Sequence, residues 1–169
     1  LDPFCGSGTS LFEANALGFD AIGIDLHPLA VKIADAKTKS HTWDNKELKK
    51  FIGEFIESIK EYNPKIDYSK EYVGDIDYLK SWFSVKILNR LFFVYYKILQ
   101  TKTSSYYQFL EIIFSSILRE CSHQDPKQLR IYKRKKFLED YDVFSIFITN
   151  LIKETNKVIA YNCVKPSKK

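Results

Sequence analysis

Apolar residues recur at helical spacing over most of the chain. Between residues 48 and 59 they fall at intervals of three or four, which is the pattern of one apolar helix face. These positions are Leu48, Phe51, Ile52, Phe55, Ile56 and Ile59. Similar patterns predict helices over residues 85–99, 106–118 and 140–159. We therefore expect a mainly helical block beyond about residue 45.

The beginning of the chain has a different pattern. Four of the six glycines in the whole chain lie within the first 23 residues. Residues 1–4 are predicted to end a strand, and residues 20–24 to form a second one. A helix is expected between them over residues 10–17, with Thr9 as its cap and Ser10 as the alternative. A further helix is expected from Pro28. Such alternation is typical of an α/β fold, whose other strands we expect elsewhere in a longer protein.

Composition and charge narrow the picture only slightly. Hydrophobic residues make up 45% of the chain, which is enough to bury a core. The net charge of +5 suits a polyanionic partner without requiring one. The three cysteines form no CxxC pair, so we expect no metal site and a reducing, cytoplasmic location. No apolar run reaches the ~20 residues that span a bilayer, so no membrane association is expected.

The glycine-rich turn after the first predicted strand is the main candidate for chemistry. Gly6 and Gly8 would let a ligand approach the backbone without a Cβ in the way. Leu11 stands where a dinucleotide fingerprint has its third glycine, and no GK[ST] follows, so dinucleotide and P-loop sites are disfavoured. Asp25 ends the second predicted strand, where a carboxylate accepts hydrogen bonds from ribose hydroxyls. Asp2 is expected to reach a cofactor's amino group or to anchor the turn.

These segments resemble motifs I and II of the DNA amino-methyltransferases. The matching stretches are residues 1–10, LDPFCGSGTS, and residues 21–31, AIGIDLHPLAV. The resemblance implies that the glycine loop holds the methionine portion of S-adenosylmethionine and that the acidic residue contacts its ribose. By motif position, the implied cofactor-binding residues are Asp2, Phe4, Gly6, Gly8 and Asp25.

The fold implied by this resemblance is a partial Rossmann-like α/β methyltransferase fold with a large, mainly α-helical insertion. Residues 1–40 would be the core that binds S-adenosylmethionine, and residues 41–169 a helical region for DNA contact or target recognition. The helical block also resembles one subgroup of the family, for example at Ile76-Asp77-Tyr78 and Trp82-Phe83-Ser84.

The function implied is a site-specific DNA methyltransferase of the kind found in restriction–modification, which methylates adenine N6 or cytosine N4. The family's catalytic Pro-Pro-Tyr or Pro-Pro-Phe motif does not occur in the 169 residues, and the sequence contains no methionine. We therefore assign no catalytic residue. We expect that motif to follow Lys169, the chain to be a fragment, and the fragment to be inactive alone.

A basic run later in the chain is the candidate for DNA contact. It contains Arg130, Tyr132, Lys133, Arg134 and Lys135, which join cations to an aromatic ring. A solvated basic loop is the alternative.

Two further alternatives concern function: a tRNA guanine-N2 methyltransferase, which has a similar Asp-Pro-Phe-Cys-Gly loop, and a truncated relic without turnover.

Overall fold

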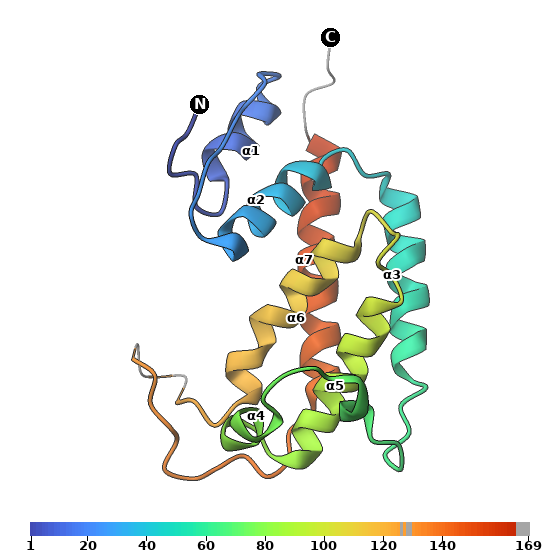
Figure 1. Ribbon diagram of the computed structural model, residues 1–169. Helices are drawn as coiled ribbons and strands as arrows, with labels where there is room; N and C mark the ends of the chain where they lie inside the picture. The colour runs from blue at the N-terminus through green and yellow to red at the C-terminus, as the bar shows by residue number, and fades with distance from the viewer. Residues whose placement is uncertain (126, 128–129, 165–169) are drawn as a thin grey trace. The chain divides into compact units, whose positions relative to one another are not determined.

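Helices make up most of the computed structural model, which describes residues 1–125, 127 and 130–164 (Figure 1). Seven of the described elements are α-helices and one is a short 3₁₀ helix, η1. They are α1 (Thr9–Ala16), α2 (Pro28–Ser40), α3 (Asn45–Ile59), η1 (Tyr68–Glu71), α4 (Ile76–Trp82), α5 (Val85–Leu99), α6 (Tyr107–Cys121) and α7 (Val143–Val164).

The predicted Rossmann-like α/β fold is wrong, because the described residues form no sheet. Their only β pairings are two isolated bridges, a parallel one between Asp2 and Gly23 and an antiparallel one between Gln124 and Lys133. In the first bridge the Asp2 amide donates to the Ile22 carbonyl at 2.8 Å, and the Ile24 amide donates to the Asp2 carbonyl at 2.9 Å. An isolated pair of strands is only marginally stable, and an independently stable sheet has further strands or a helix packed against it. Neither predicted strand has another neighbour in the described part of the chain, so the pairing stops at one bridge.

The helical predictions agree better with the structure. The helix predicted over residues 85–99 coincides with α5, and those predicted over 106–118 and 140–159 correspond to α6 and α7. Helix α4 was missed because it is short and has no continuous apolar face. Its start is fixed instead by Asp75, whose side chain accepts a hydrogen bond from the Tyr78 amide at 2.8 Å.

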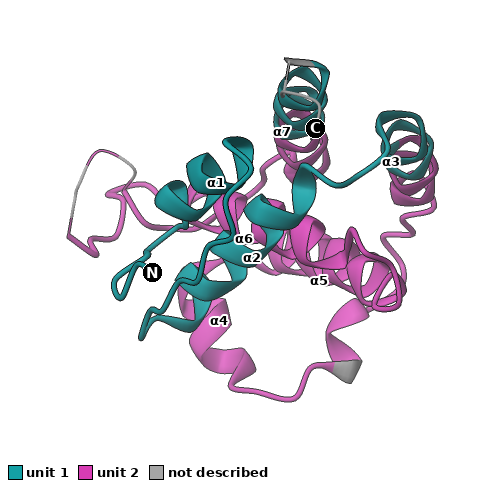
Figure 2. Ribbon diagram, turned by 90° about the horizontal axis from the view of Figure 1, so that it is seen from above, with its two compact units in different colours: residues 1–52, 152–169 teal, residues 53–151 magenta. Residues whose placement is uncertain are grey.

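The chain divides into two compact units (Figure 2). Unit 1 comprises residues 1–52 and the chain from residue 152 onward, and unit 2 comprises residues 53–151. Both α3 and α7 contribute one end to each unit. The predicted boundary at residue 40 stays a prediction.

Unit 1 places the glycine-rich segment against α2. Helices α1 and α2 pack together, and the Phe12 ring lies 4.4 Å from the Tyr161 ring, centroid to centroid. The Asn162 side chain donates to the carbonyls of Ser40 at 3.1 Å and Trp43 at 3.3 Å. These bonds join the end of α7 to the chain that leaves α2, and so hold the framework around α1.

Unit 2 has its core along α5, which packs against α6, α4 and η1. The α5 side chains in this core include Ile87, Leu91, Phe93, Val94 and Ile98. Leu110 and Ile117 of α6 are also almost completely buried. Phe93 further contacts the rings of Tyr62 and Phe144 at centroid distances of 5.3 and 6.1 Å. Burial of these large apolar side chains is the main stabilising contribution in unit 2.

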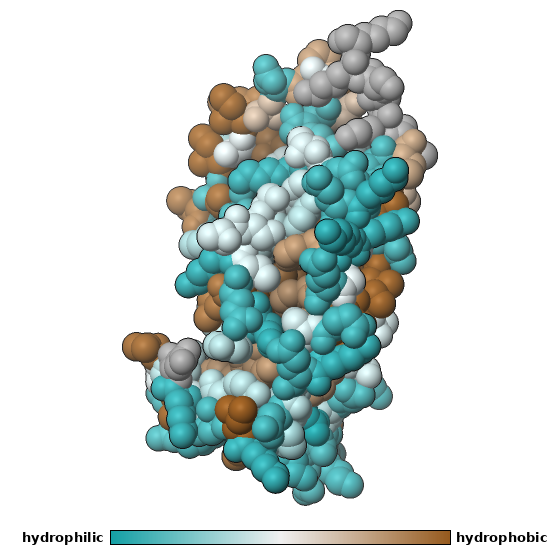
Figure 3. Space-filling view, turned by 90° about the vertical axis from the view of Figure 1, so that its right-hand side faces the viewer, coloured by the Kyte–Doolittle hydropathy of each residue, from teal (hydrophilic) through white to brown (hydrophobic). Residues whose placement is uncertain are grey.

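The surface is mixed in character. The face drawn in Figure 3 is mostly hydrophilic, with apolar side chains reaching the surface in separate patches. Among the helices described, none is long and apolar enough to cross a membrane.

Candidate functional site

The glycine loop turns sharply into α1 because both of its glycines adopt positive φ. Gly6 has φ of 50° and Gly8 has φ of 74°, a region that disfavours residues with a Cβ. The Gly8 amide donates to the Cys5 carbonyl at 2.8 Å, and the Gly8 carbonyl accepts from the Phe12 amide at 2.9 Å. Gly8 is therefore the N-cap of α1, and the expected cap by Thr9 or Ser10 is wrong.

The two glycines have different surroundings. A Cβ on Gly8 would lie 2.6 Å from the Ala34 Cβ and 2.8 Å from the Ala34 Cα, far inside van der Waals contact. A Cβ on Gly6 would meet no atom within 4 Å. Gly8 therefore allows α2 to approach the loop, whereas Gly6 faces open space that a ligand can enter.

Asp25 joins the second predicted strand to the glycine loop. One of its carboxylate oxygens accepts the Gly6 amide at 2.9 Å, and the other accepts the His27 amide at 2.8 Å. The hydrogen bonds from the amides of His27 and Gly6 lower the pKa of Asp25, so it stays ionised at neutral pH. Each oxygen keeps a further acceptor position, because an ionised carboxylate has about four lone-pair sites.

Asp2 anchors the start of the same loop. Its carboxylate accepts the Ser10 hydroxyl at 2.6 Å and the Phe4 amide at 3.1 Å, and these two hydrogen bonds lower the pKa of Asp2. The Phe4 side chain is 84% exposed. The expected anchoring of the turn by Asp2 did not extend to its partner Ser10, a contact that forms only in the folded turn. No local pattern indicates the closeness of Gly8 to Ala34, because it depends on how segments distant in sequence pack.

The five predicted cofactor residues thus lie in one part of unit 1. The bridge at Asp2 and the hydrogen bond from Gly6 to Asp25 bring the two motifs together. Phe4 and Gly8 lie on the same turn as Gly6, within the first motif. Whether these residues bind a cofactor stays a prediction.

Two cations of the basic run, Lys133 and Arg134, contact other residues of unit 2. The Lys133 amino group lies 4.8 Å from the Trp82 ring centroid, a cation–π contact. The Arg134 guanidinium donates to the carbonyls of Gln124 at 2.9 Å and Glu120 at 3.0 Å. Lys133 is nevertheless exposed, as are Arg130, Tyr132, Lys135 and Lys136, whereas Arg134 is half-buried. Contact of any of these residues with DNA stays a prediction.

His123 is buried and packs against the end of this basic segment. Its ring stacks on Phe137 at a centroid distance of 4.4 Å, and its amide donates to the Trp82 carbonyl at 2.7 Å. Burial, reinforced by the nearby cations Lys133 and Arg134, lowers the pKa of His123. Within the described residues no three His, Cys, Asp or Glu side chains are placed to hold a metal ion together.

Comparison with known proteins gives two relatives. The type II methyltransferase M.MjaII of Methanocaldococcus jannaschii is 31% identical over 96 residues, which cover 54% of this chain and 18% of that protein. The type II methyltransferase M.MvaI of Kocuria varians is 27% identical over 135 residues, which cover 78% of this chain and 29% of that protein. No family model and no solved structure matches.

The chain is similar to these two type II methyltransferases. The resemblance to DNA methyltransferases that the sequence predicts is thereby confirmed. The chain spans less than a third of the length of either relative.

In this chain, Gly8→Ala is expected to destabilise unit 1 more than Gly6→Ala does. Both substitutions put a Cβ at positive φ, which costs ~1–2 kcal/mol. Only the Gly8 variant adds a collision with Ala34, which is expected to cost a further ~1–3 kcal/mol. Urea unfolding of the two variants measures the difference. Equal losses in the free energy of unfolding would contradict the close approach of α2.

The chain is also expected to lose stability as the pH falls below the ordinary histidine pKa of 6.5. Because the folded state lowers the pKa of His123, the unfolded state takes up the proton first. His123→Phe keeps the stacking on Phe137 and removes this titration. Urea unfolding at about pH 7 and about pH 5.5 should show a smaller loss in this variant. An unaltered loss in His123→Phe would refute the assignment.

Proposed function

We propose that the chain is the part of a DNA methyltransferase that binds S-adenosylmethionine, and that the whole enzyme methylates the exocyclic amino group of adenine or cytosine. The similarity to type II methyltransferases supports the reaction class. The observation that carries the proposal is the joining of the Gly6 amide to the Asp25 carboxylate at 2.9 Å. The carboxylate beside this open, glycine-lined turn would serve as an acceptor for a nucleoside.

The nucleoside half of the cofactor fits Asp25. A ribose presents two neighbouring hydroxyl donors, and the two Asp25 oxygens each accept one backbone amide already. The backbone bonds fix the orientation of the carboxylate and leave it acceptor positions for the hydroxyls. Open space at the Gly6 Cβ position gives the ligand access to the backbone.

The methionine half fits the turn into α1. No side chain caps the start of α1, so its first amides and the positive end of its dipole are left for an anion such as a carboxylate. Asp2, held by Ser10 and the Phe4 amide, offers a negative charge for an ammonium group. When bound, S-adenosylmethionine supplies a methyl group on a sulfonium centre, and these residues would hold it in place.

The acceptor is proposed to be DNA in the cytoplasm. The exposed cations Arg130, Lys135 and Lys136 would neutralise phosphates. The chain holds no Pro-Pro-Tyr or Pro-Pro-Phe segment, so we assign none of its residues to the target base.

Asp25→Ala is expected to abolish binding of S-adenosylmethionine by the 169-residue chain. The substitution removes the ribose acceptor and the bond that holds Gly6. Isothermal titration calorimetry measures the loss. Asp20→Ala is the matched control, because Asp20 is an exposed acid of the same unit and should leave the affinity unchanged. Full affinity in Asp25→Ala would eliminate the proposed site.

Replacing Arg130, Lys135 and Lys136 together by Ala is expected to weaken DNA binding and flatten its salt dependence. Each lost phosphate contact reduces the slope of log K against log salt by about 0.9 for duplex DNA. Filter binding at several salt concentrations gives the slope. A triple replacement of the exposed lysines Lys49, Lys102 and Lys153 is the control. Equal slopes for the two triple variants would show that the run is only a solvated loop.

A further inference from the structure

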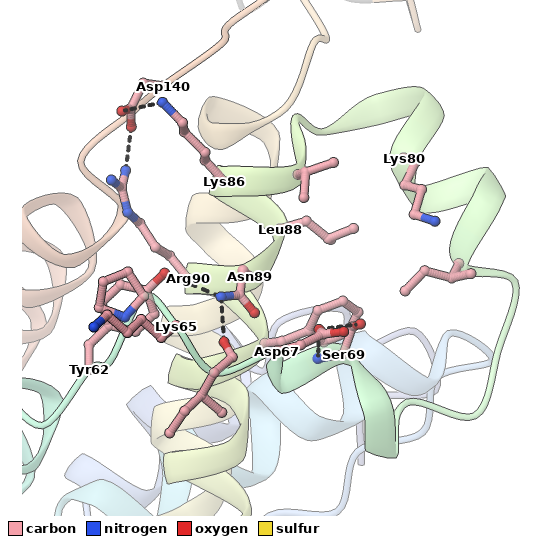
Figure 4. Close-up of a pocket in the computed structure, with 15 residues that line it drawn as sticks. Tyr62, Lys65, Asp67, Ser69, Lys80, Lys86, Leu88, Asn89, Arg90 and Asp140 are labelled. Atoms are coloured by element: carbon pink, nitrogen blue, oxygen red, sulfur yellow. Dashed lines mark hydrogen bonds and ion pairs between the residues drawn. The ribbon is translucent and has the colours of Figure 1, made fainter.

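Unit 2 contains a pocket made entirely of its own residues (Figure 4). It lies among η1, α4, α5 and the segment at Asp140, and its volume is about 660 Å³. Pockets that bind small molecules commonly have volumes of about 300–1,000 Å³. None of its residues belongs to the glycine loop or to the basic run, so nothing proposed above uses it.

The inner surface of the pocket is apolar. Leu88 and Phe92 of α5 are 6% and 9% exposed, and Ile76 of α4 also lines the pocket. A flat aromatic ring can be buried against such a surface, with a gain of about 25 cal/mol for each Å² of apolar area removed from water.

The rim is predominantly cationic. Four of the lining residues are basic and two are acidic: Lys65, Lys80, Lys86, Arg90, Asp67 and Asp140. In Figure 4, Lys86 and Arg90 extend from α5 toward Asp140, whereas Lys80 lies on the opposite side on α4. The rim thus joins a cationic corner to a separate acidic position at Asp67.

The cationic corner holds an anion that belongs to the chain itself. The Asp140 carboxylate pairs with the Arg90 guanidinium and lies 3.9 Å from the Lys86 amino group. Arg90 is fixed further by donating to the Tyr141 carbonyl at 2.7 Å. The side chains of Lys86 and Asp140 are 73% and 53% exposed. The Arg90 side chain is only 24% exposed. The Lys86–Asp140 pair is open to solvent and therefore weak, and a phosphate that accepts from both cations can compete with the carboxylate for them.

The acidic position offers an acceptor for an amino group. One Asp67 oxygen accepts both the amide and the hydroxyl of Ser69, at 3.0 and 2.6 Å. No described residue donates to the other oxygen of Asp67. It is therefore left for a donor such as the exocyclic amino group of a base.

We propose that this pocket binds a nucleoside 5′-phosphate, with the base against Leu88 and Phe92 and the phosphate at Lys86 and Arg90 in place of Asp140. The nucleotide can be free or part of a DNA strand, since both present the same base and phosphate. The site is additional to the cofactor loop and does not depend on it.

The test is calorimetric titration of the 169-residue chain with adenosine 5′-monophosphate and with adenosine. The nucleotide is expected to bind at least about tenfold more tightly, because only it carries the phosphate. Lys86→Ala should weaken nucleotide binding several-fold. Asp140→Asn should strengthen it, because the competing charge is gone, and a gain cannot result from misfolding.

Exposed lysines outside the pocket provide the controls. Lys49→Ala and Lys102→Ala remove the same charge and should leave nucleotide affinity unchanged. Equal affinity for nucleotide and nucleoside would overturn the proposal. So would unchanged or weaker binding in Asp140→Asn, or an effect of the control variants as large as that of Lys86→Ala.

A short single-stranded DNA identifies the source of the nucleotide. Tighter binding of the oligonucleotide by Asp140→Asn indicates a unit of a strand, and an effect confined to the mononucleotide indicates a free nucleotide. Titration of the same variants with S-adenosylmethionine separates the two proposals. Asp25→Ala is expected to affect only that ligand, and Lys86→Ala only the nucleotide.

Discussion

The candidate site depends on one interaction, the hydrogen bond between the Gly6 amide and the Asp25 carboxylate. It joins two segments that are otherwise connected by a single β-bridge and its neighbouring backbone hydrogen bonds. Because Asp25 is also bound by the His27 amide at the start of α2, the same carboxylate orients both the glycine turn and the following helix. A charged acceptor with two backbone donors is well suited to this task, since such bonds are stronger than neutral ones.

Sequence predicted the helices well because their signal is local. The apolar spacing of α5 marks its limits at Val85 and Leu99, and Ser84 caps its start. The prediction of a Rossmann-like sheet was wrong, because strand pairing depends on neighbouring strands that the periodicity of one segment does not reveal. The same contrast holds at the site. Motif position placed Gly6 and Asp25 together correctly, whereas the support of Asp2 by Ser10 arises only from the folded turn.

The cations of unit 2 show why the distribution of charge along the sequence could not locate an anion-binding site. Lys133 and Arg134 stand in the basic run, yet the first lies over Trp82 and the second donates to one carbonyl at the end of α6 and one just after it. Arg90, by contrast, stands in an apolar helix and gave no signal, yet it forms the cationic corner with Asp140. The density of charge along the sequence therefore does not reveal which groups each cation contacts in the folded chain.

The turn at Gly6 and Gly8 is proposed to contact S-adenosylmethionine. Selective ¹⁵N labelling of glycine gives one amide signal for each of the six glycines in the chain. On addition of S-adenosylmethionine, the Gly6 and Gly8 signals are expected to shift, while those of Gly53 and Gly74 stay in place. Unchanged Gly6 and Gly8 signals at saturating cofactor would contradict this contact.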